Sequence, residues 1–453
     1  MRRRQLAGVI LASALITFDG TATTVALPAI GRDLSASISR LQWIANAPLL
    51  VLAAMLLPAG TLADRFGRVR VMRIGLIAFV AASCAAASAA SDAGVIAAKF
   101  VQGAAGALVL PAALAVLRAA YTDVDERARM FGVWAAWTGL ASAAGPLMAG
   151  AIVDLWSWRP VFLPSAVAGL AAVLLLEREA STSATSSTPV PGRAIVALIV
   201  LVGAAAYFLM YGPSTGATAA RLALPAVLVI VGTAVLVRDP RRQVLFPREL
   251  LTARNCLPAN ATTFALSFGM FGLSFIVVLY VQQLLQYSAL WAAVVLLPIS
   301  ILLLFAERLG RLTAVIGTRW VIVTGAVAAA VGIGWIGSSP HPVPFWSHLI
   351  AGTGLFGFGL SVAVSALTHA AVAGVPETCA GTASGLNHAV VRGAGLVSVA
   401  LLGSIAAPGM SDSVSAEGVQ RALLTCAGVV GAGGILGGVF LRDDQPGGLP
   451  ASD

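Results

Sequence analysis

Charged residues are scarce in this chain: 10% of its 453 residues are charged, whereas 58% are hydrophobic and the mean hydropathy is +0.92. A soluble protein has about 25% charged and about 45–50% apolar residues, so this composition excludes a soluble multidomain enzyme. Each membrane-spanning helix needs about 20 apolar residues. Fourteen such helices would use about 280 residues and leave no room for a large soluble domain.

Lysine is nearly absent, since Lys99 is the only one. A phosphate-binding loop needs the pattern GxxxxGK followed by Ser or Thr, and Lys99 is followed by Phe100, so an ATP-driven motor of this kind is excluded. The four cysteines and four histidines show no CxxC or HExxH spacing. The sequence therefore predicts no disulfide framework, metal site, cofactor or catalytic residue, and the chain is not expected to be an enzyme.

A GxGxxG pattern at Gly352–Gly357 lies inside an apolar helical run with no strand before it. A dinucleotide site needs a preceding strand, so close helix packing is the better interpretation. The net charge of +9 is compatible with nucleic-acid binding, but no basic run alternates with aromatic residues on a polar face. We therefore expect no nucleic-acid partner, and membrane orientation explains the charge better.

Apolar runs of roughly 17–27 residues predict fourteen membrane-spanning helices and thus an all-α membrane protein. The runs cover residues 6–30, 41–63, 71–90, 94–117, 130–153, 159–176, 194–211, 221–237, 256–281, 289–306, 320–337, 347–370, 380–406 and 419–441. The first run follows Arg2–Arg4 and resembles a signal peptide in that respect. Its length and the presence of Asp19 argue against cleavage.

The distribution of basic residues predicts the orientation. With the N-terminus inside, 21 of the 28 basic residues fall on the inner side, five fall outside and two lie within spans. This asymmetry agrees with the positive-inside rule and supports an even number of helices. We expect a multi-pass protein of the cytoplasmic (inner) membrane with both termini in the cytoplasm.

Two polar stretches divide the predicted spans. Residues 180–192 are small, polar and proline-containing, as in a flexible linker. Residues 238–254 are basic and contain two prolines, which indicates a cytoplasmic interfacial segment. The predicted organisation, in chain order, is an N-terminal six-helix bundle (1–177), a linker (178–193), two inserted helices (194–237), a basic segment (238–255), a C-terminal six-helix bundle (256–441) and a cytoplasmic tail (442–453).

A short pattern occurs once in each predicted bundle. Residues 60–67 and 310–317 both read Gly-x-Leu-x4-Gly, and both follow the second helix of their bundle. The second copy has Ala314 where the first has Asp64. Three matched positions can arise by chance, so the pattern is suggestive of an internal repeat and does not prove one.

The first copy also packs four charged residues into a short turn, Gly60-Thr-Leu-Ala-Asp-Arg-Phe-Gly-Arg-Val-Arg70. Glycines let helix ends approach closely, and Asp64 can cap a helix or pair with an arginine. The turn resembles the G-x-L-a-D-R-x-G-R loop of the major facilitator superfamily, where it latches the cytoplasmic side of two six-helix bundles. The resemblance implies that fold and these latch residues: Gly60, Asp64, Arg65, Gly67 and Arg68.

Other segments resemble the fourteen-helix drug:proton antiporters of that superfamily. Residues 19–28 (Asp-Gly-Thr-Ala-Thr-Thr-Val-Ala-Leu-Pro) are similar to the family's first-helix signature, with Thr24 in place of its usual asparagine. Residues 99–106 resemble R-x-x-Q-G-x-G, with lysine in place of arginine. Residues 141–150 resemble the fifth-helix antiporter motif G-x-x-x-G-P-x-x-G-G, although alanine replaces two of its glycines. The motif residues that this implies are Gly145, Pro146 and Gly150, and Arg392 falls in a similar stretch of the second half.

Asp19 is the only acidic residue near the middle of a predicted span. A carboxylate at mid-bilayer costs roughly 2.5–3.5 kcal/mol, so it needs a functional or structural reason. A carboxyl group there can take up and release a proton as its access to water changes, which makes Asp19 the candidate for proton coupling; a purely structural pairing is the alternative. Lys99 is its possible charge partner, but at 1.5 Å per residue Lys99 is expected roughly 10 Å above the midplane, which argues against direct contact. Asp154, near a helix end, is a secondary candidate.

The predicted function is secondary export of a lipophilic, drug-like compound or an endogenous natural product in exchange for protons, by alternating access of two bundles. The predicted partners are this small substrate, protons and the lipid bilayer. One alternative is an uptake symporter or facilitator of the same superfamily, against which the Gly145-Pro146 motif argues. Another is a non-transporting membrane sensor or scaffold, which the presence of both Asp19 and Asp64 disfavours.

Overall fold

The computed structural model describes residues 3–121, 123–176, 192–211, 219–239, 253, 255–372, 375, 380–407 and 413–441. The described residues form helices joined by short turns, and no strand occurs among them. The predicted all-α fold class is confirmed. Only helices satisfy every backbone hydrogen bond within one continuous segment, which is what a chain in lipid requires.

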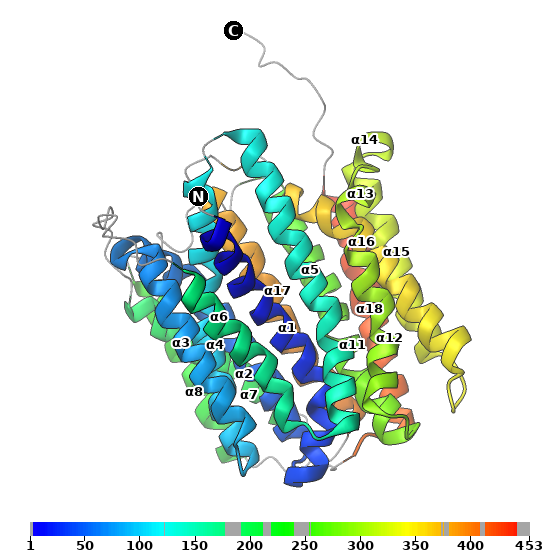
Figure 1. The fold of residues 1–453 in the computed structure, drawn as a ribbon. Coiled ribbons are helices and arrows are strands. Elements are labelled where there is room, and N and C mark those ends of the chain that lie inside the picture. Colours follow the sequence, from blue (N-terminus) through cyan, green and yellow to red (C-terminus); the bar gives the residue numbers. More distant parts are fainter. Residues whose placement is uncertain are drawn as a thin grey trace.

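The first six long helices pack against one another and form what we call the N-terminal group, drawn from blue to blue-green in Figure 1. They are α1 (Arg3–Leu34), α2 (Ile38–Phe66), α3 (Arg68–Ala87), α4 (Asp92–Ala120), α5 (Val124–Leu155) and α6 (Leu163–Leu175), with the short 3-10 helix η1 (Arg159–Phe162) before α6. Side-chain caps fix two of the starts, since Ser91 accepts from Gly94 and Asp123 accepts from Glu126.

The last long helices form a second set, the C-terminal group, drawn from green to red in Figure 1. They are α11 (Cys256–Leu279) with its π-helical extension η2 (Tyr280–Leu284), α12 (Ala289–Leu303), the short α13 (Ala306–Gly310) and α14 (Thr313–Ile316), α15 (Thr318–Gly337), the π-helix η3 (Phe345–Ile350) leading into α16 (Ala351–Val372), α17 (Ala380–Ala406) and α18 (Ala416–Phe440).

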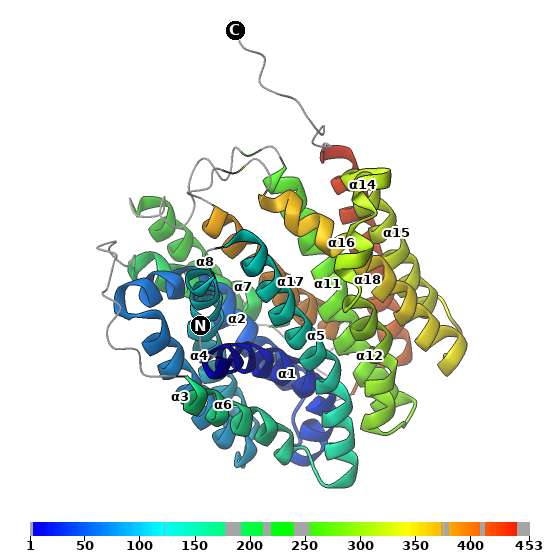
Figure 2. The ribbon, with the colours of Figure 1, turned by 45° about the horizontal axis from the view of Figure 1, so that its top comes forward.

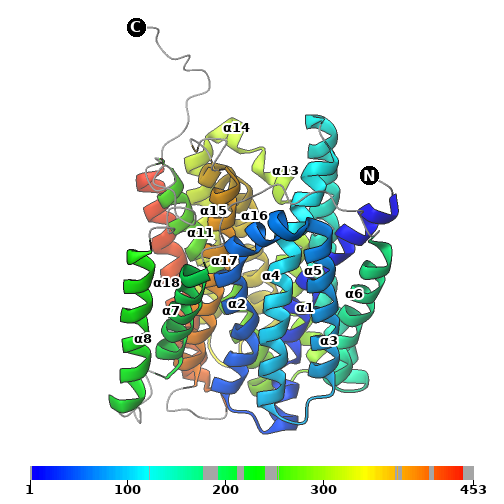
Figure 3. The same ribbon diagram turned by 90° about the vertical axis from the view of Figure 1, so that its left-hand side faces the viewer.

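Two further helices, α7 (Gly192–Tyr211) and α8 (Ala219–Arg238), pack against each other. Figure 3 shows this green pair at the edge of the molecule, and α7 is the member that contacts α2 and α17. Most of the predicted linker 178–193 and of the basic segment 238–255, and all of the tail 442–453, lie outside the described residues. The domain boundaries therefore stay a prediction.

A helix occurs at each of the fourteen predicted spans. Ten helices in the described chain are long and apolar enough to cross a membrane, and three shorter apolar helices cover Arg159–Leu175, Pro225–Val235 and Ala289–Leu303. The predicted number of crossings is thus partly confirmed. Large apolar side chains such as Leu174 and Ile230 are exposed on the outside of the structure, as expected for a surface that faces lipid tails.

The N-terminal and C-terminal groups meet through two helix pairs, α2 with α17 and α5 with α12. Helix α1 begins and α18 ends at the same end of the molecule, at the top of Figure 1; we call this the terminal side and the other end the far side. Figure 2, with the terminal side turned forward, shows α1, α5 and α17 in the middle of the molecule, where the two groups meet.

The glycine pattern at Gly352–Gly357 lies in the α16 region and serves packing, as predicted. A Cβ atom on Gly352 would lie 2.9 Å from the carbonyl oxygen of Gly332 on α15, and one on Gly357 would lie 2.7 Å from the Cα atom of Ile299 on α12. Both distances are shorter than any real side chain tolerates, so the glycines allow the backbones to touch.

Candidate functional site

A cavity of about 260 Å³ lies between the N-terminal and C-terminal groups. Helices α1, α2, α3, α4 and α5 line it from one side, and α11, α12 and α17 line it from the other. Most of its lining is apolar, and three lining residues carry charge: Asp19, Lys99 and Arg392. A mainly apolar cavity with a few polar groups is typical of a site for a small organic molecule.

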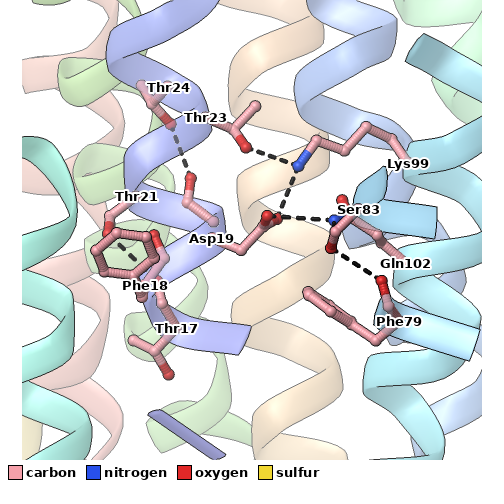
Figure 4. Close-up of polar contacts among 11 residues, drawn as sticks. Thr17, Phe18, Asp19, Thr21, Thr23, Thr24, Phe79, Ser83, Lys99 and Gln102 are labelled. Atoms are coloured by element: carbon pink, nitrogen blue, oxygen red, sulfur yellow. Dashed lines mark hydrogen bonds and ion pairs between the residues drawn. The ribbon is translucent and has the colours of Figure 1, made fainter. Parts of the chain in front are cut away.

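Asp19 of α1 and Lys99 of α4 form an ion pair in the cavity wall, with 2.7 Å between Lys99 Nζ and Asp19 Oδ2 (Figure 4). The Asp19 residue is 5% exposed and the Lys99 residue is fully buried. The expectation that they lie too far apart for contact is therefore wrong. That estimate compared positions along the two helices and ignored the reach of the four-carbon lysine stem.

Three more side chains hold the pair in place. The Lys99 ammonium also donates to Thr23 Oγ1 at 2.6 Å and lies 4.8 Å from the centre of the Phe162 ring. The Gln102 amide donates to Asp19 Oδ1 at 3.2 Å and to Ser83 Oγ at 2.8 Å. Both charges are thus paired and hydrogen-bonded, as buried charges must be to remain ionised.

The spacing of these residues explains why they meet. Thr23 follows Asp19 by four residues and Gln102 follows Lys99 by three, so each pair lies on one face of its helix. The sequence analysis did not select Thr23 or Gln102 as site residues. The sequence signal that could have identified Thr23 and Gln102 is their spacing of four and three residues from Asp19 and Lys99.

One acceptor of this network has no protein partner. Gln102 Oε1 is buried and accepts no hydrogen bond from the residues that the structure describes. By contrast, the cavity-lining threonines Thr17, Thr21 and Thr24 donate back to carbonyl groups of their own helix. The hydroxyl donors of these three threonines are therefore already used, and the Asp19–Lys99–Gln102 network is the main polar feature of this wall.

Asp154 lies at the far-side end of α5 and caps a helix of the other group. Its two carboxylate oxygens each accept a hydrogen bond at 3.0 Å, one from the backbone amide of Ala289 and one from that of Leu290. These amides belong to the first turn of α12, where an acidic side chain is favourable. Asp154 does not reach Asp19 and instead links the two groups.

The antiporter-motif residues bring α5 close to two other helices. A Cβ atom on Gly145 would collide with Thr21 Oγ1 of α1, and one on Gly150 would lie 2.7 Å from the Cα atom of Leu290. Pro146, between them, lines the cavity. The motif therefore permits close contact on both sides of α5 at the wall of the cavity.

Two glutamines add further links between the groups on the far side. Gln42 Nε2 of α2 donates to the carbonyl groups of Val399 and Ala400 on α17, both at 2.8 Å. Gln282 Nε2 of η2 donates to the carbonyl of Val25 on α1 at 3.0 Å. With Asp154, these contacts join the two groups on the far side.

The predicted latch residues lie elsewhere, on the terminal side between α2 and α3. Gly67 has φ of +93°, a conformation that favours glycine, and Arg68 donates to the carbonyl of Ala115 on α4 at 3.3 Å. The Arg65 guanidinium lies 5.5 Å from the ring of Phe66, whereas the Asp64 side chain lies outside the described part of the structure.

Within the described residues, a Cβ atom on Gly60 would meet no heavy atom within 4 Å. The role of the latch glycines stays a prediction. The predicted repeat has structural support, because Gly317 between α14 and α15 has φ of +83°, close to that of Gly67.

Comparisons with known proteins agree with this architecture. The family model described as Major Facilitator Superfamily matches residues 9–399. A multidrug resistance protein, Stp, of Mycobacterium tuberculosis (strain CDC 1551 / Oshkosh) is 30% identical over 432 residues, covering 93% of this chain and 80% of that protein. A probable actinorhodin transporter of Streptomyces coelicolor is 33% identical over 430 residues, covering 89% and 72%.

A methylenomycin A resistance protein of Bacillus subtilis (strain 168) is 32% identical over 344 residues, covering 73% of this chain and 72% of that protein. Among solved structures, a crystal structure of a peptide transporter, POT, in complex with sulfate is similar with a TM-score of 0.70 and 16% identity. The similarity covers 96% of this chain and 93% of that chain. At this identity the likeness shows the fold alone.

Proposed function

The chain belongs to the major facilitator superfamily, and we propose that it exports lipophilic, drug-like compounds or one endogenous natural product in exchange for protons. Export is supported by relatives that are named as multidrug resistance, antibiotic resistance or natural-product transport proteins. The mainly apolar cavity between the two helix groups supports a lipophilic substrate. No enzymatic activity is expected.

The buried ion pair between Asp19 and Lys99 is the observation that carries proton coupling. The pair lies in the cavity wall, so a proton can reach the carboxylate whenever water enters the cavity. Protonation of Asp19 removes one charge of the pair and with it the attraction between α1 and α4 at this point. If the side-chain amide of Gln102 flips, its unused Oε1 can accept a hydrogen bond from the protonated Asp19 carboxyl group.

The contacts on the far side support alternating access. The links made by Gln42, Asp154 and Gln282 join the two groups there, so this conformation is closed on the far side. Opening that side requires these hydrogen bonds to break while the groups rock about the cavity. The latch loop around Asp64 would hold the terminal side closed in the opposite state.

We propose that the terminal side faces the cytoplasm, as the positive-inside rule indicates, and that the membrane is the cytoplasmic membrane. Single cysteines at positions 183 and 411, introduced after the native cysteines are replaced, should react with an impermeant maleimide from opposite sides, with position 411 outside. Labelling of both from one side would contradict the topology.

Coupling is tested in proteoliposomes with an imposed proton gradient and an uncharged lipophilic dye, Nile red. Asp19→Asn keeps the size of the side chain but cannot titrate, so gradient-driven accumulation should be lost, whereas downhill counterflow of the dye should persist. Asp19→Glu should retain some accumulation. An uncharged dye is used because a cationic one would also lose a charge partner. If the asparagine variant still accumulates dye against its gradient, proton coupling through Asp19 is refuted.

A further inference from the structure

Arg392 is a charged residue of the cavity for which the coupling mechanism gives no role. It lies on α17, in the C-terminal group, and lines the cavity across from the Asp19–Lys99 pair. Within the described parts of the chain, no side chain or carbonyl group hydrogen-bonds to its guanidinium, and no carboxylate pairs with it. Every other charge in the lining has a partner.

The charges of the lining do not cancel. Asp19 and Lys99 neutralise each other at 2.7 Å, so Arg392 leaves the cavity with one excess positive charge. His388 lies one turn away on the same face of α17 and is exposed, and it brings no negative charge. The cavity thus has a neutral polar wall on α1 and α4 and a cationic wall on α17.

An unpaired guanidinium in an apolar, membrane-embedded cavity is costly, and an anionic partner relieves that cost. Arginine presents its N–H donors in a planar fork that matches the two oxygens of a carboxylate or other oxyanion. The remaining lining includes Phe79, Phe271, Phe275 and Leu296, which offer an apolar surface to the body of a ligand. A volume of about 260 Å³ suits a compact ligand, since drug-sized sites are about 300–1,000 Å³.

We propose that the cavity selects lipophilic anions: compounds with an apolar body and a carboxylate or similar oxyanion, which binds Arg392. The proposal rests on the export function above and specifies its substrate class. The oxyanion of the substrate binds Arg392 on the C-terminal group, while the apolar body of the substrate contacts both groups. Substrate therefore bridges the two halves that must move relative to each other.

Two xanthene dyes of similar size test the charge preference. Fluorescein is anionic at neutral pH, whereas tetramethylrosamine is cationic and lacks the carboxylate. Fluorescence anisotropy with the purified full-length chain in neutral detergent should show fluorescein binding about tenfold more tightly, or better, the difference expected for one charge-assisted contact. Equal binding, tighter binding of the cation, or binding of neither dye overturns the proposal.

Variants at Arg392 assign the preference to this residue. Arg392→Gln should weaken fluorescein binding about tenfold and leave tetramethylrosamine binding unchanged or tighter, and Arg392→Lys should restore part of the fluorescein affinity. Arg421→Gln is the matched control, because Arg421 is exposed on α18 and pairs with Glu417, away from the cavity. It should bind both dyes as the unmodified chain does.

If Arg392→Gln loses the same affinity for both dyes and its size-exclusion profile is unchanged, the assignment of the anion preference to Arg392 is overturned. If that variant does not fold, Arg392→Lys decides, because lysine keeps the positive charge at this position. Equal binding constants of this variant for fluorescein and tetramethylrosamine would then contradict an anion preference set by that charge. The binding assay uses no gradient. A chain that prefers the cation but still accumulates Nile red keeps the export function and loses only the substrate class.

Discussion

The two helix groups share an architecture and both bring helices together at glycines, but they differ in the charge that they bury. The N-terminal group buries a network of charge, in which Asp19, Lys99 and Gln102 join α1 and α4. In the described part of the C-terminal group no buried ion pair occurs, and α15 and α16 touch backbone to backbone through Gly332, Gly352 and their neighbours. Gly75 and Gly103 allow similar backbone contacts of α4 with α3 and α2 in the N-terminal group. An ion pair can be switched by one proton, whereas a glycine seam cannot. If protons drive export as proposed above, we expect the charged network of the N-terminal group to respond to protonation and the glycine contacts of both groups to stay unchanged.

Breaking the charged network should give the largest effect. Lys99→Met leaves Asp19 buried without its counter-charge, and we expect a loss of about 3–5 kcal/mol of stability. Thermal unfolding in detergent, followed by intrinsic tryptophan fluorescence, measures it. Lys99→Arg should retain most of the stability. The double variant Lys99→Met/Asp19→Asn should recover much of the loss, and no recovery would contradict a pairwise interaction.

Breaking the glycine seam should cost somewhat less. A Cβ atom on Gly332 would lie 2.6 Å from the carbonyl oxygen of Gly352, so Gly332→Val should lower stability by about 1–3 kcal/mol through overpacking. Gly428→Ala on α18 is the control, since a Cβ atom there meets nothing within 4 Å. That variant should be neutral or slightly more stable. Equal melting temperatures for the two variants would argue against a tightly packed seam.

The corresponding turns of the two groups, at Gly67 and Gly317, should lose similar stability when their glycine is replaced. Gly67 and Gly317 both have positive φ at the turn before the third helix of their group. Gly67→Ala and Gly317→Ala should therefore each cost about 1–2 kcal/mol. Differential scanning fluorimetry of the two variants tests the correspondence. A substantial loss in only one of them would show that the repeat does not extend to the energetics of the turns.

The smallest effect is expected at the contact between the groups. Asp154→Ala removes the cap on α12 and should lower stability by about 1 kcal/mol. It should also favour opening of the far side, since one of three links is lost. A cysteine at position 25, buried in this conformation, should then react faster with maleimide. An unchanged rate would mean that Asp154 is only a helix cap.

The sequence predicted the helices well because an apolar run in lipid has no alternative to helical hydrogen bonding. It predicted Asp19 for a related reason, since one carboxylate among apolar residues is conspicuous. The contact with Lys99 was not predictable from helix positions, because side-chain reach and helix tilt decide it. Nor does the sequence show that α12 ends at Leu303, because the residues up to Ala306 are apolar and fit a longer helix. The two short helices that follow, in a segment with Glu307 and Arg308, are not visible in the sequence either.

The unpaired state of Arg392 was equally hidden. Whether an arginine in a span has a partner depends on what the neighbouring helices present, and the helices packed against α17 include α2, α7 and α11. Sequence spacing along α17 carries no information about them. Asp19 could be found from the sequence because it only requires counting the acidic residues within spans. That Arg392 lacks a partner becomes visible only when the fold brings the helices together.

All three links on the far side attach a side chain to main-chain atoms. Gln42 binds carbonyl groups of α17, Asp154 binds amides of α12, and Gln282 binds a carbonyl of α1. The receiving helices can therefore exchange their own side chains without losing these bonds. Cavity-facing side chains of α12 and α17 can therefore be substituted without removing the main-chain groups that form these three bonds, unless proline replaces Ala289 or Leu290 and removes the amide that Asp154 binds.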